Sequence, residues 1–191
     1  GILFIADEVQ TGWGRTGEHF WGYQAHGITP DIITFAKGIG NGLAIGGVIA
    51  RADVMNCLKA NSLSTFGGNP LATRGALETL RYVKRHDLQA NAHARGAELR
   101  AGLDRLARQH GAIADVRGKG LMQAIEFADR ATKKPNGPAS LALLEETRLR
   151  GLLIGRGGLY GNCNRLAPPL TITREEIAEG LEILEAALKA A

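Results

Sequence analysis

Two short apolar runs, each leading into a reactive side chain, limit the possible folds of this chain more than any other feature. Residues Ile2–Ala6 lead directly into Asp7, and Ile32–Ala36 lead directly into Lys37. Continuous apolar runs of this length are typical of strands that are buried on both faces of a parallel sheet. We therefore expect both runs to be buried strands of an α/β domain.

Turn and capping residues mark the elements that follow these strands. Gly47–Ala50 is expected to form a third strand after a glycine-rich turn. Asn69 is a favourable helix N-cap, and Pro70 suits the first helical position, so a helix is predicted from there to about His86.

The pattern changes to a mixture of helices and strands after residue 87. Thr173 and Glu176 form the capping box of a last helix. The other expected elements are helices at about 88–110 and 139–150, and strands near 113–116, 121–127 and 152–154. We expect residues 1–87 to be the end of a large parallel-sheet domain and residues 88–191 to be a small α+β domain.

Asp7 and Lys37 are the candidate catalytic pair. The carboxyl ends of parallel strands share one edge of a sheet, where ligands bind, and a spacing of 30 residues suits neighbouring strands joined by one crossover. By position alone, however, such a lysine is usually an ordinary surface residue, and such an acid usually forms a turn.

The same pair meets the chemical needs of pyridoxal phosphate. An amine can form a Schiff base with the cofactor aldehyde, and a carboxylate can keep the pyridine nitrogen protonated so that the ring acts as an electron sink. Because side chains alternate along an extended chain, Asp7 and Val9 can share a face while Glu8 points away.

Other binding motifs fit their surroundings poorly. Gly12–Gly17 matches the dinucleotide pattern G-x-G-x-x-G, but it does not follow a strand directly, and Asp31 precedes its strand instead of following it. The five histidines include no i, i+4 pair, and Cys57 and Cys163 are far apart, so no metal site is expected.

Charge and hydropathy bear on partners and compartment. The net charge is +4, and residues 74–119 hold ten Lys or Arg against five Asp or Glu. These charges alternate at helical spacing, which favours a solvated helix face over nucleic-acid binding. No apolar run approaches the ~20 residues of a membrane-spanning helix. With two distant cysteines, we expect a reducing compartment, which is the cytoplasm, or the mitochondrial matrix if the source is eukaryotic.

Four motifs, in this order, resemble the class-III pyridoxal-phosphate-dependent aminotransferases over essentially the whole chain. They are Ile5–Gly12, Phe35–Gly38, Thr65–Pro70 and Arg165–Leu170. Within that family, three further segments are most similar to the alanine–glyoxylate aminotransferase type 2 group: His19–Gln24, Asp115–Gly120 and Gly151–Gly157.

The resemblance implies a fold-type I transferase and a role for each matching residue. Lys37 is then the Schiff-base lysine and proton shuttle, and Asp7 is the partner of the pyridine nitrogen. The remaining roles are ring packing by Val9, contact with the phenolic oxygen by Gln10, contact with the partner subunit's cofactor phosphate by Thr65, and binding of the substrate carboxylate by Arg165.

The resemblance also implies a homodimeric transaminase that moves an amino group from alanine or a similar amine to glyoxylate or pyruvate. Alternatives are 4-aminobutyrate and ornithine-type ω-aminotransferases, and aminomutases and a decarboxylase share these motifs. Because family chains are much longer at the amino end, we expect this chain to be a carboxyl-terminal fragment. An inactive interaction module is the alternative from another class.

Overall fold

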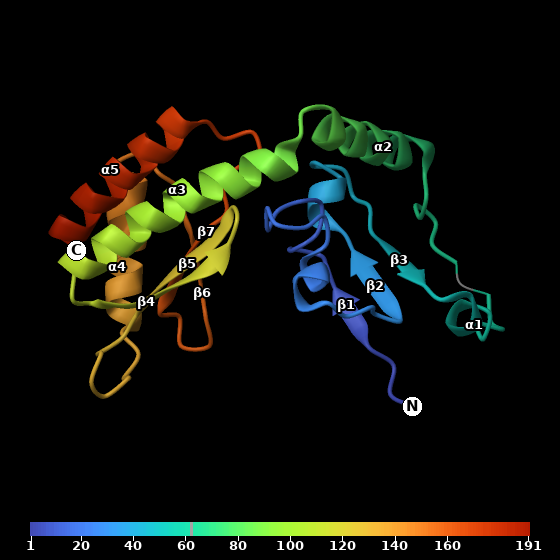
Figure 1. Cartoon of the computed structure of the whole chain (residues 1–191), viewed down its shortest axis with the longest axis horizontal. Helices are drawn as coiled ribbons and strands as arrows, with labels where there is room; N and C mark the ends of the chain where they lie inside the picture. The colour runs from blue at the N-terminus through green and yellow to red at the C-terminus, as the bar shows by residue number, and fades with distance from the viewer. Residues whose placement is uncertain (62) are drawn as a thin grey trace. The chain divides into compact units, whose positions relative to one another are not determined.

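The computed structural model describes residues 1–61 and 63–191, and the chain forms two compact units. The first unit is Gly1–Ala90 and the second is Asn91–Ala191. Each contains its own sheet and helices, which Figure 1 labels, and each is described by itself. Among the described residues, no helix is long and apolar enough to cross a lipid bilayer.

The sheet of the first unit contains β1 (Ile5–Asp7), β2 (Ile32–Phe35) and β3 (Gly47–Ala50), in that order. β1 and β2 are parallel, as the sequence predicted for these two runs. β3 is antiparallel to β2, which makes the sheet mixed. The link between β2 and β3 holds only a short 3-10 turn, whereas a parallel return needs a crossover of a dozen or more residues.

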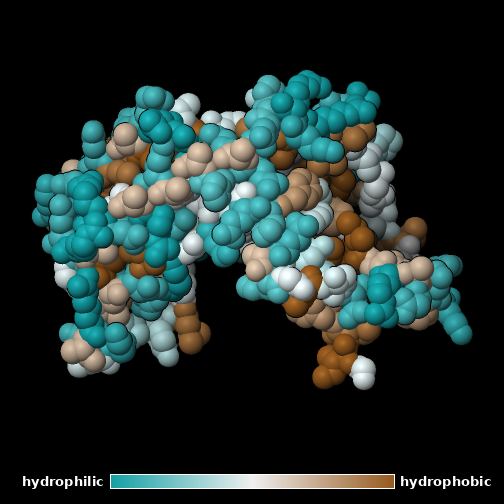
Figure 2. All heavy atoms as spheres, viewed as in Figure 1, coloured by the Kyte–Doolittle hydropathy of each residue, from teal (hydrophilic) through white to brown (hydrophobic). Residues whose placement is uncertain are grey.

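The prediction that both apolar runs are fully buried is wrong. Ile2 is 98% exposed and Ile5 is 55% exposed, and the residues of β2 are only half-buried. Among the described residues β1 pairs with β2 alone, and of its three residues Ala6 is buried while Ile5 and Asp7 are exposed. Figure 2 shows hydrophobic atoms gathered at the amino-terminal end of the chain.

Outside the sheet, the described part of the first unit contains one long helix, three short ones and the first residues of α3 (Leu88–Gln109), which continues into the second unit. The long helix, α2 (Pro70–Arg85), begins as predicted, with the Asn69 side chain accepting a 2.9 Å hydrogen bond from the backbone N–H of Ala72. The short elements are η1 (Gly22–His26), η2 (Lys37–Ile39) and α1 (Ala52–Met55). α1 was not predicted from the sequence.

The second unit contains an antiparallel sheet whose strand order is β4-β5-β7-β6. Its strands are β4 (Ile113–Lys119), β5 (Met122–Phe127), β6 (Gly155–Gly157) and β7 (Cys163–Leu166). β4 and β5 agree with the prediction. The strand expected at 152–154 lies instead at 155–157, and β7 was not predicted, because neither segment has the apolar alternation typical of a strand.

Three helices cover one face of this sheet: α3 (Leu88–Gln109), α4 (Gly137–Leu149) and α5 (Arg174–Ala190). Along β5, Ile125 and Phe127 are buried in the core, whereas Ala124 and Glu126 face the uncovered side. The predicted α3 stripe of Leu99, Leu103 and Leu106 lies in the same core. The predicted capping box of Thr173 and Glu176 begins α5.

Candidate active site

Asp7 is the last residue of β1 and stands opposite Thr34 of β2 in the parallel register. Its Oδ1 atom accepts a 3.1 Å hydrogen bond from the backbone N–H of Val9 and a 3.4 Å bond from the Thr34 hydroxyl. Asp7 is exposed, and the next residue, Glu8, is buried. Asp7 and Glu8 therefore differ in burial, as the expected alternation implies, but Val9 lies in a turn after β1, so its predicted shared face with Asp7 stays a prediction.

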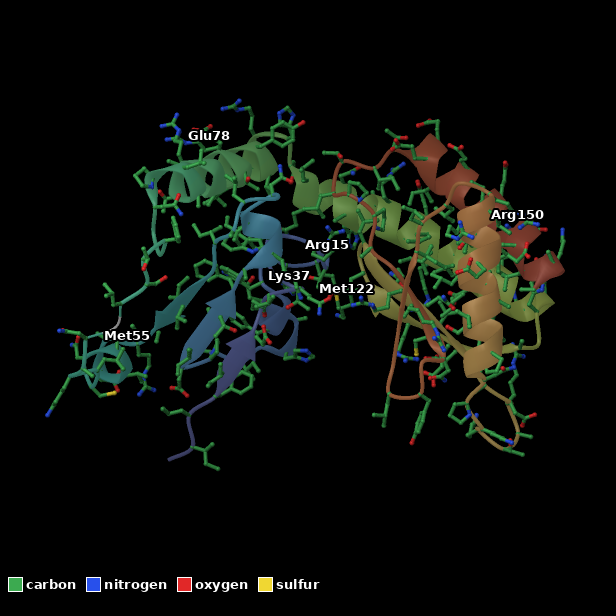
Figure 3. The ribbon with its side chains drawn as sticks, turned by 180° about the vertical axis from the view of Figure 1, so that it is seen from behind. Arg15, Lys37, Met55, Glu78, Met122 and Arg150 are labelled. Atoms are coloured by element: carbon green, nitrogen blue, oxygen red, sulfur yellow. The ribbon has the colours of Figure 1, made fainter. Side chains whose placement is uncertain are left out.

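Lys37 follows β2 by two residues and begins the short helix η2 (Figure 3). Its side chain is exposed, while Ile39 and Gly40 beside it are buried. The backbone of Lys37 has φ = 48°, a left-handed conformation that costs a non-glycine residue roughly 1–2 kcal/mol. Strain of this kind persists where the surroundings enforce it, and it is common at functional sites.

Asp7 ends β1 and Lys37 comes two residues after β2, so both lie at the carboxyl ends of neighbouring parallel strands, as the sequence predicted. The edge of the sheet at these ends carries one carboxylate and one primary amine. That donor set suits pyridoxal phosphate, because the carboxylate can hold a protonated ring nitrogen and the amine can bond to an aldehyde. Val9 and Gln10 form the turn just after Asp7, with Val9 partly buried and Gln10 exposed.

The loop after this turn contains the glycine pattern Gly12–Gly17 and an aromatic cluster. Trp13 packs edge-to-face against Phe20 and Phe35, at ring-centroid distances of 5.7 and 5.4 Å. Burial lowers the pKa of the Arg15 guanidinium in the same loop. The loop consists of turns and is followed by η1 and not by a long helix, so it lacks the strand–turn–helix context of a dinucleotide site.

Thr65 lies in an exposed turn just before α2. The turn is held by Gly67 N–H, which donates to Ser64 O over 3.1 Å, and by the Asn69 side chain, which donates to Phe66 O over 2.9 Å. The structure records no hydrogen bond from Thr65 to Asp7 or Lys37 within the part of the chain it describes. Its predicted role at a partner subunit's site stays a prediction.

Arg165 belongs to the second unit, where it projects from β7 on the uncovered side of the sheet. It pairs across the strands with Ala124 of β5 on one side and Gly155 of β6 on the other. A Cβ added at Gly155 or Gly157 would lie 3.7 or 3.5 Å from Arg165 Nε. The two glycines thus form a flat surface beneath the arginine side chain, a feature that was missed in the sequence although the Gly-Arg-Gly spacing is visible there.

A second arginine, Arg117, occupies the same cross-strand row beyond Ala124. Its Nη1 atom lies 2.7 Å from Asp115 and 2.5 Å from Glu126, and these carboxylates raise its pKa above the usual value, Asp115 most. Asn162 donates a 3.0 Å hydrogen bond to Glu126 and, together with Arg117, lowers the pKa of that carboxyl. This network was not predicted from the sequence, because its members come from two strands, β4 and β5, and from the loop before β7.

Comparison with known proteins identifies the family. The family model described as aminotransferase class-III matches residues 1–188. The chain is 43% identical over 178 residues to "Alanine--glyoxylate aminotransferase 2 homolog 2, mitochondrial" of Arabidopsis thaliana, covering 92% of this chain and 37% of that protein. It is 41% identical over 186 residues to 4-aminobutyrate aminotransferase GabT of Escherichia coli strain K12, and this match covers 96% of this chain and 43% of that protein.

Solved structures agree with the sequence matches. A phospholyase from Arthrobacter in complex with phosphoethanolamine has a TM-score of 0.93 and 36% identity, covering 99% of this chain and 46% of that one. An aminotransferase of Bacillus anthracis has a TM-score of 0.92 and 34% identity, covering 99% and 45%. The chain spans less than half the length of these relatives. It belongs to the class-III aminotransferases, a family of pyridoxal-phosphate-dependent enzymes with the fold-type I architecture.

Proposed function

We propose that this chain carries the lysine and the acid of a transaminase site, and that the whole protein moves an amino group from an amino acid to a 2-oxo acid. The observation that carries the proposal is that Asp7 and Lys37 follow the ends of neighbouring parallel strands. Pyridoxal phosphate, when bound, supplies an aldehyde for the amine and a ring that withdraws electrons from the substrate.

Each candidate residue has one task in this proposal. The Lys37 amine holds the cofactor covalently and then carries the proton that moves during transamination. The Asp7 carboxylate keeps the ring nitrogen protonated, Val9 packs against the ring, and Gln10 contacts the phenolic oxygen. Thr65 contacts the cofactor phosphate of the partner subunit in a homodimer. In the proposed domain division, residues 1–87 bind the cofactor and residues 88–191 carry Arg165.

We propose Arg165 as the residue that binds the substrate carboxylate. A guanidinium can donate two parallel hydrogen bonds to a carboxylate, whereas a lysine acts as a point charge. Arg165 is exposed on β7, and Pro168 and Pro169 stiffen the segment that follows it. Amino acids and 2-oxo acids both present the carboxylate that such a group would recognise.

Alanine or a similar amine as the donor, with glyoxylate or pyruvate as the acceptor, is the substrate pair we favour. Support comes from relatives named alanine–glyoxylate aminotransferase 2 in Arabidopsis thaliana and Homo sapiens, at 43% and 38% identity. 4-Aminobutyrate and ornithine-type ω-amines are the alternative donors, since GabT of Escherichia coli is 41% identical. The names of the two alanine–glyoxylate relatives include "mitochondrial", so the matrix and the cytoplasm are both proposed compartments.

Phospholyase activity is a second candidate, since the Arthrobacter phospholyase is 36% identical to this chain and the match covers 99% of it. Phosphoethanolamine is an amine without a carboxylate, so this reaction would not need the carboxylate contact that we assign to Arg165. It would release inorganic phosphate and would need no 2-oxo acid acceptor.

One assay of the full-length protein, loaded with pyridoxal phosphate, distinguishes these functions. The donors would be alanine, 4-aminobutyrate and phosphoethanolamine, each with and without glyoxylate. Pyruvate would be a second acceptor for the latter two donors, because alanine and pyruvate only regenerate each other. We expect alanine turnover that depends on the acceptor and disappears in Lys37→Ala. Phosphate release without an acceptor would favour the phospholyase. If no donor reacts and the protein does not take up the cofactor, the transaminase proposal fails and the alternative of an interaction module stands.

A further inference from the structure

Glu8, the residue next to Asp7, is a buried carboxylate with hydrogen bonds to both of its oxygens. It is 2% exposed. Its Oε2 atom accepts hydrogen bonds from the Thr11 hydroxyl over 2.6 Å and from Gly22 N–H over 2.8 Å, and its Oε1 atom accepts from Tyr23 N–H over 2.7 Å. The side chain thus joins the end of β1 to the first residues of η1, fourteen and fifteen positions further along the chain.

The backbone around Glu8 is shaped for this close approach. A Cβ at Gly22 would lie 2.7 Å from Thr11 Cβ and 3.3 Å from the Glu8 Oε2 atom. A Cβ at Gly12 would lie 2.9 Å from the Glu8 carbonyl oxygen, which accepts a 3.1 Å hydrogen bond from Gly12 N–H. Both positions need glycine because any side chain would push the loop away from the carboxylate.

The Asp7 side chain, by contrast, is restrained by weaker hydrogen bonds than those of Glu8. It is exposed, and the bonds recorded to its carboxylate within residues 1–61 and 63–191 are the two longer ones, from Val9 N–H and the Thr34 hydroxyl. Glu8 N–H donates a 2.9 Å bond to Thr34 O, so the backbone on the carboxyl side of Asp7 is fixed through Glu8. That bond uses the Glu8 backbone alone. The Glu8 side chain holds the turn that follows, and the N–H of Val9 in this turn bonds to the Asp7 carboxylate.

We propose that Glu8 is a positioning residue that aims the Asp7 carboxylate, by anchoring the turn after β1 to η1. This inference rests on the proposed function for the role of Asp7, but the anchoring itself does not depend on it. A carboxylate suits the position because it offers acceptors only. A glutamine has one oxygen and one NH2 group, so the NH2 would face at least one backbone or hydroxyl donor, and a buried group left unpaired is costly.

The test compares Glu8→Gln with the unchanged protein in two measurements on the full-length chain. The first is amide hydrogen exchange without cofactor, since the Val9 N–H bonds directly to Asp7 and reports its position. We expect exchange at Val9, Gly22 and Tyr23 to speed up by about tenfold, while Val48 in β3 stays unchanged. The second is the pH midpoint of the bound cofactor's visible absorbance, which should shift in the same direction as in Asp7→Asn.

Val83→Ala is the matched control, because it removes buried side-chain atoms from α2 without touching the Glu8 network. It should lower the melting temperature and leave both readouts unchanged. If Glu8→Gln behaves like this control, Glu8 is merely structural and the inference is overturned.

Thr11→Val covers the case in which Glu8→Gln does not fold, since it removes one of the three hydrogen bonds. It should give a smaller change at Val9, and an unchanged Val9 would also overturn the inference. If the protein without substitutions binds the cofactor but transfers no amino group, that result counts against the proposed function and not against the anchoring by Glu8. In that case the amide hydrogen exchange rate of Val9 in Glu8→Gln would still test the anchoring, because it does not depend on catalysis.

Discussion

Asp7 and Thr34 stand opposite each other in the parallel register of β1 and β2, and the Thr34 hydroxyl donates a hydrogen bond to the Asp7 carboxylate. Three residues after Thr34 the chain reaches Lys37, in a left-handed backbone conformation. A single strand, β2, therefore supports the acid of its neighbour and carries the amine at its own end.

Lys37 is expected to be the residue that bonds to the cofactor. Borohydride reduction of the loaded full-length protein, followed by peptide mapping, should find the label on Lys37. Lys37→Ala should lower kcat by roughly 10²–10⁴-fold, since it also removes the proton carrier. Lys84→Ala, an exposed lysine on α2, is the control and should keep normal activity. A label on any other lysine would contradict the assignment.

Asp7→Asn should slow catalysis without preventing cofactor binding. The amide keeps the shape of the carboxylate and can still accept from Val9 N–H and Thr34, but it lacks the charge that holds a proton on the ring nitrogen. We expect kcat to fall by about 10²-fold or more. Asp53→Asn, an exposed acid of α1, should have no such effect. Near-normal turnover in Asp7→Asn would remove Asp7 from the mechanism.

Arg165→Lys should separate substrates by whether they carry a carboxylate. Loss of a paired, charge-assisted contact of about 1.5–3 kcal/mol predicts a fall of roughly ten- to hundredfold in kcat/KM for amino and 2-oxo acids. Amines without a carboxylate should react as before. The measurement is kcat/KM for both classes in one preparation, and equal losses for the two would mean that Arg165 is structural.

Glu126→Gln should destabilise the protein at neutral pH and have little effect in acid. Asn162 and Arg117 lower the pKa of Glu126, so its contribution is fully present above the ordinary value of 4.5 and is lost as the pH falls through the lowered pKa. We expect a loss of about 1 kcal/mol at pH 7, because the pair is partly exposed. Thermal unfolding from pH 3 to 7 measures it, and a constant difference across that range would refute the linkage.

Gly96→Ala and Gly180→Ala should change stability in opposite directions, although both glycines lie inside helices. A Cβ at Gly96 of α3 would lie 2.4 Å from the backbone of Gly120, so alanine must push the helix away, at roughly 1–3 kcal/mol. A Cβ at Gly180 of α5 would meet nothing within 4 Å, so alanine there should gain up to about 1 kcal/mol. Denaturant unfolding should give a lower free energy of unfolding for Gly96→Ala and a higher one for Gly180→Ala.

Periodic and capped segments were predicted well from the sequence. The apolar spacing of Leu99, Leu103 and Leu106 and the caps at Asn69 and Thr173 depend on neighbours within one or two helical turns, and all of them appear in the structure as predicted. The positions of Asp7 and Lys37 at the ends of parallel strands followed in the same way, from two local patterns and one rule of sheet geometry.

Features that depend on distant partners were not predictable in this way. β7 has no apolar alternation because Asn164 is paired inside the core and Arg165 faces outward, so its strand character comes from pairing with β5 and β6. The burial of Glu8 depends on Gly22 and Tyr23, which reach it only after the chain has folded back. The exposure of Ile2 goes with its place before the first residue of β1, outside the strand, which the composition of the run does not specify.

Gly155 and Gly157, the two glycines beneath Arg165, are positions where substitution can alter the surroundings of the arginine side chain. Their Cβ positions lie at ordinary van der Waals distances from the arginine side chain, so each can accept a methyl group without collision. Each atom added at Gly155 or Gly157 reduces the volume that is open to the Arg165 side chain. Substitutions at positions 155 and 157 can therefore limit the conformations of the Arg165 side chain while the arginine itself is retained.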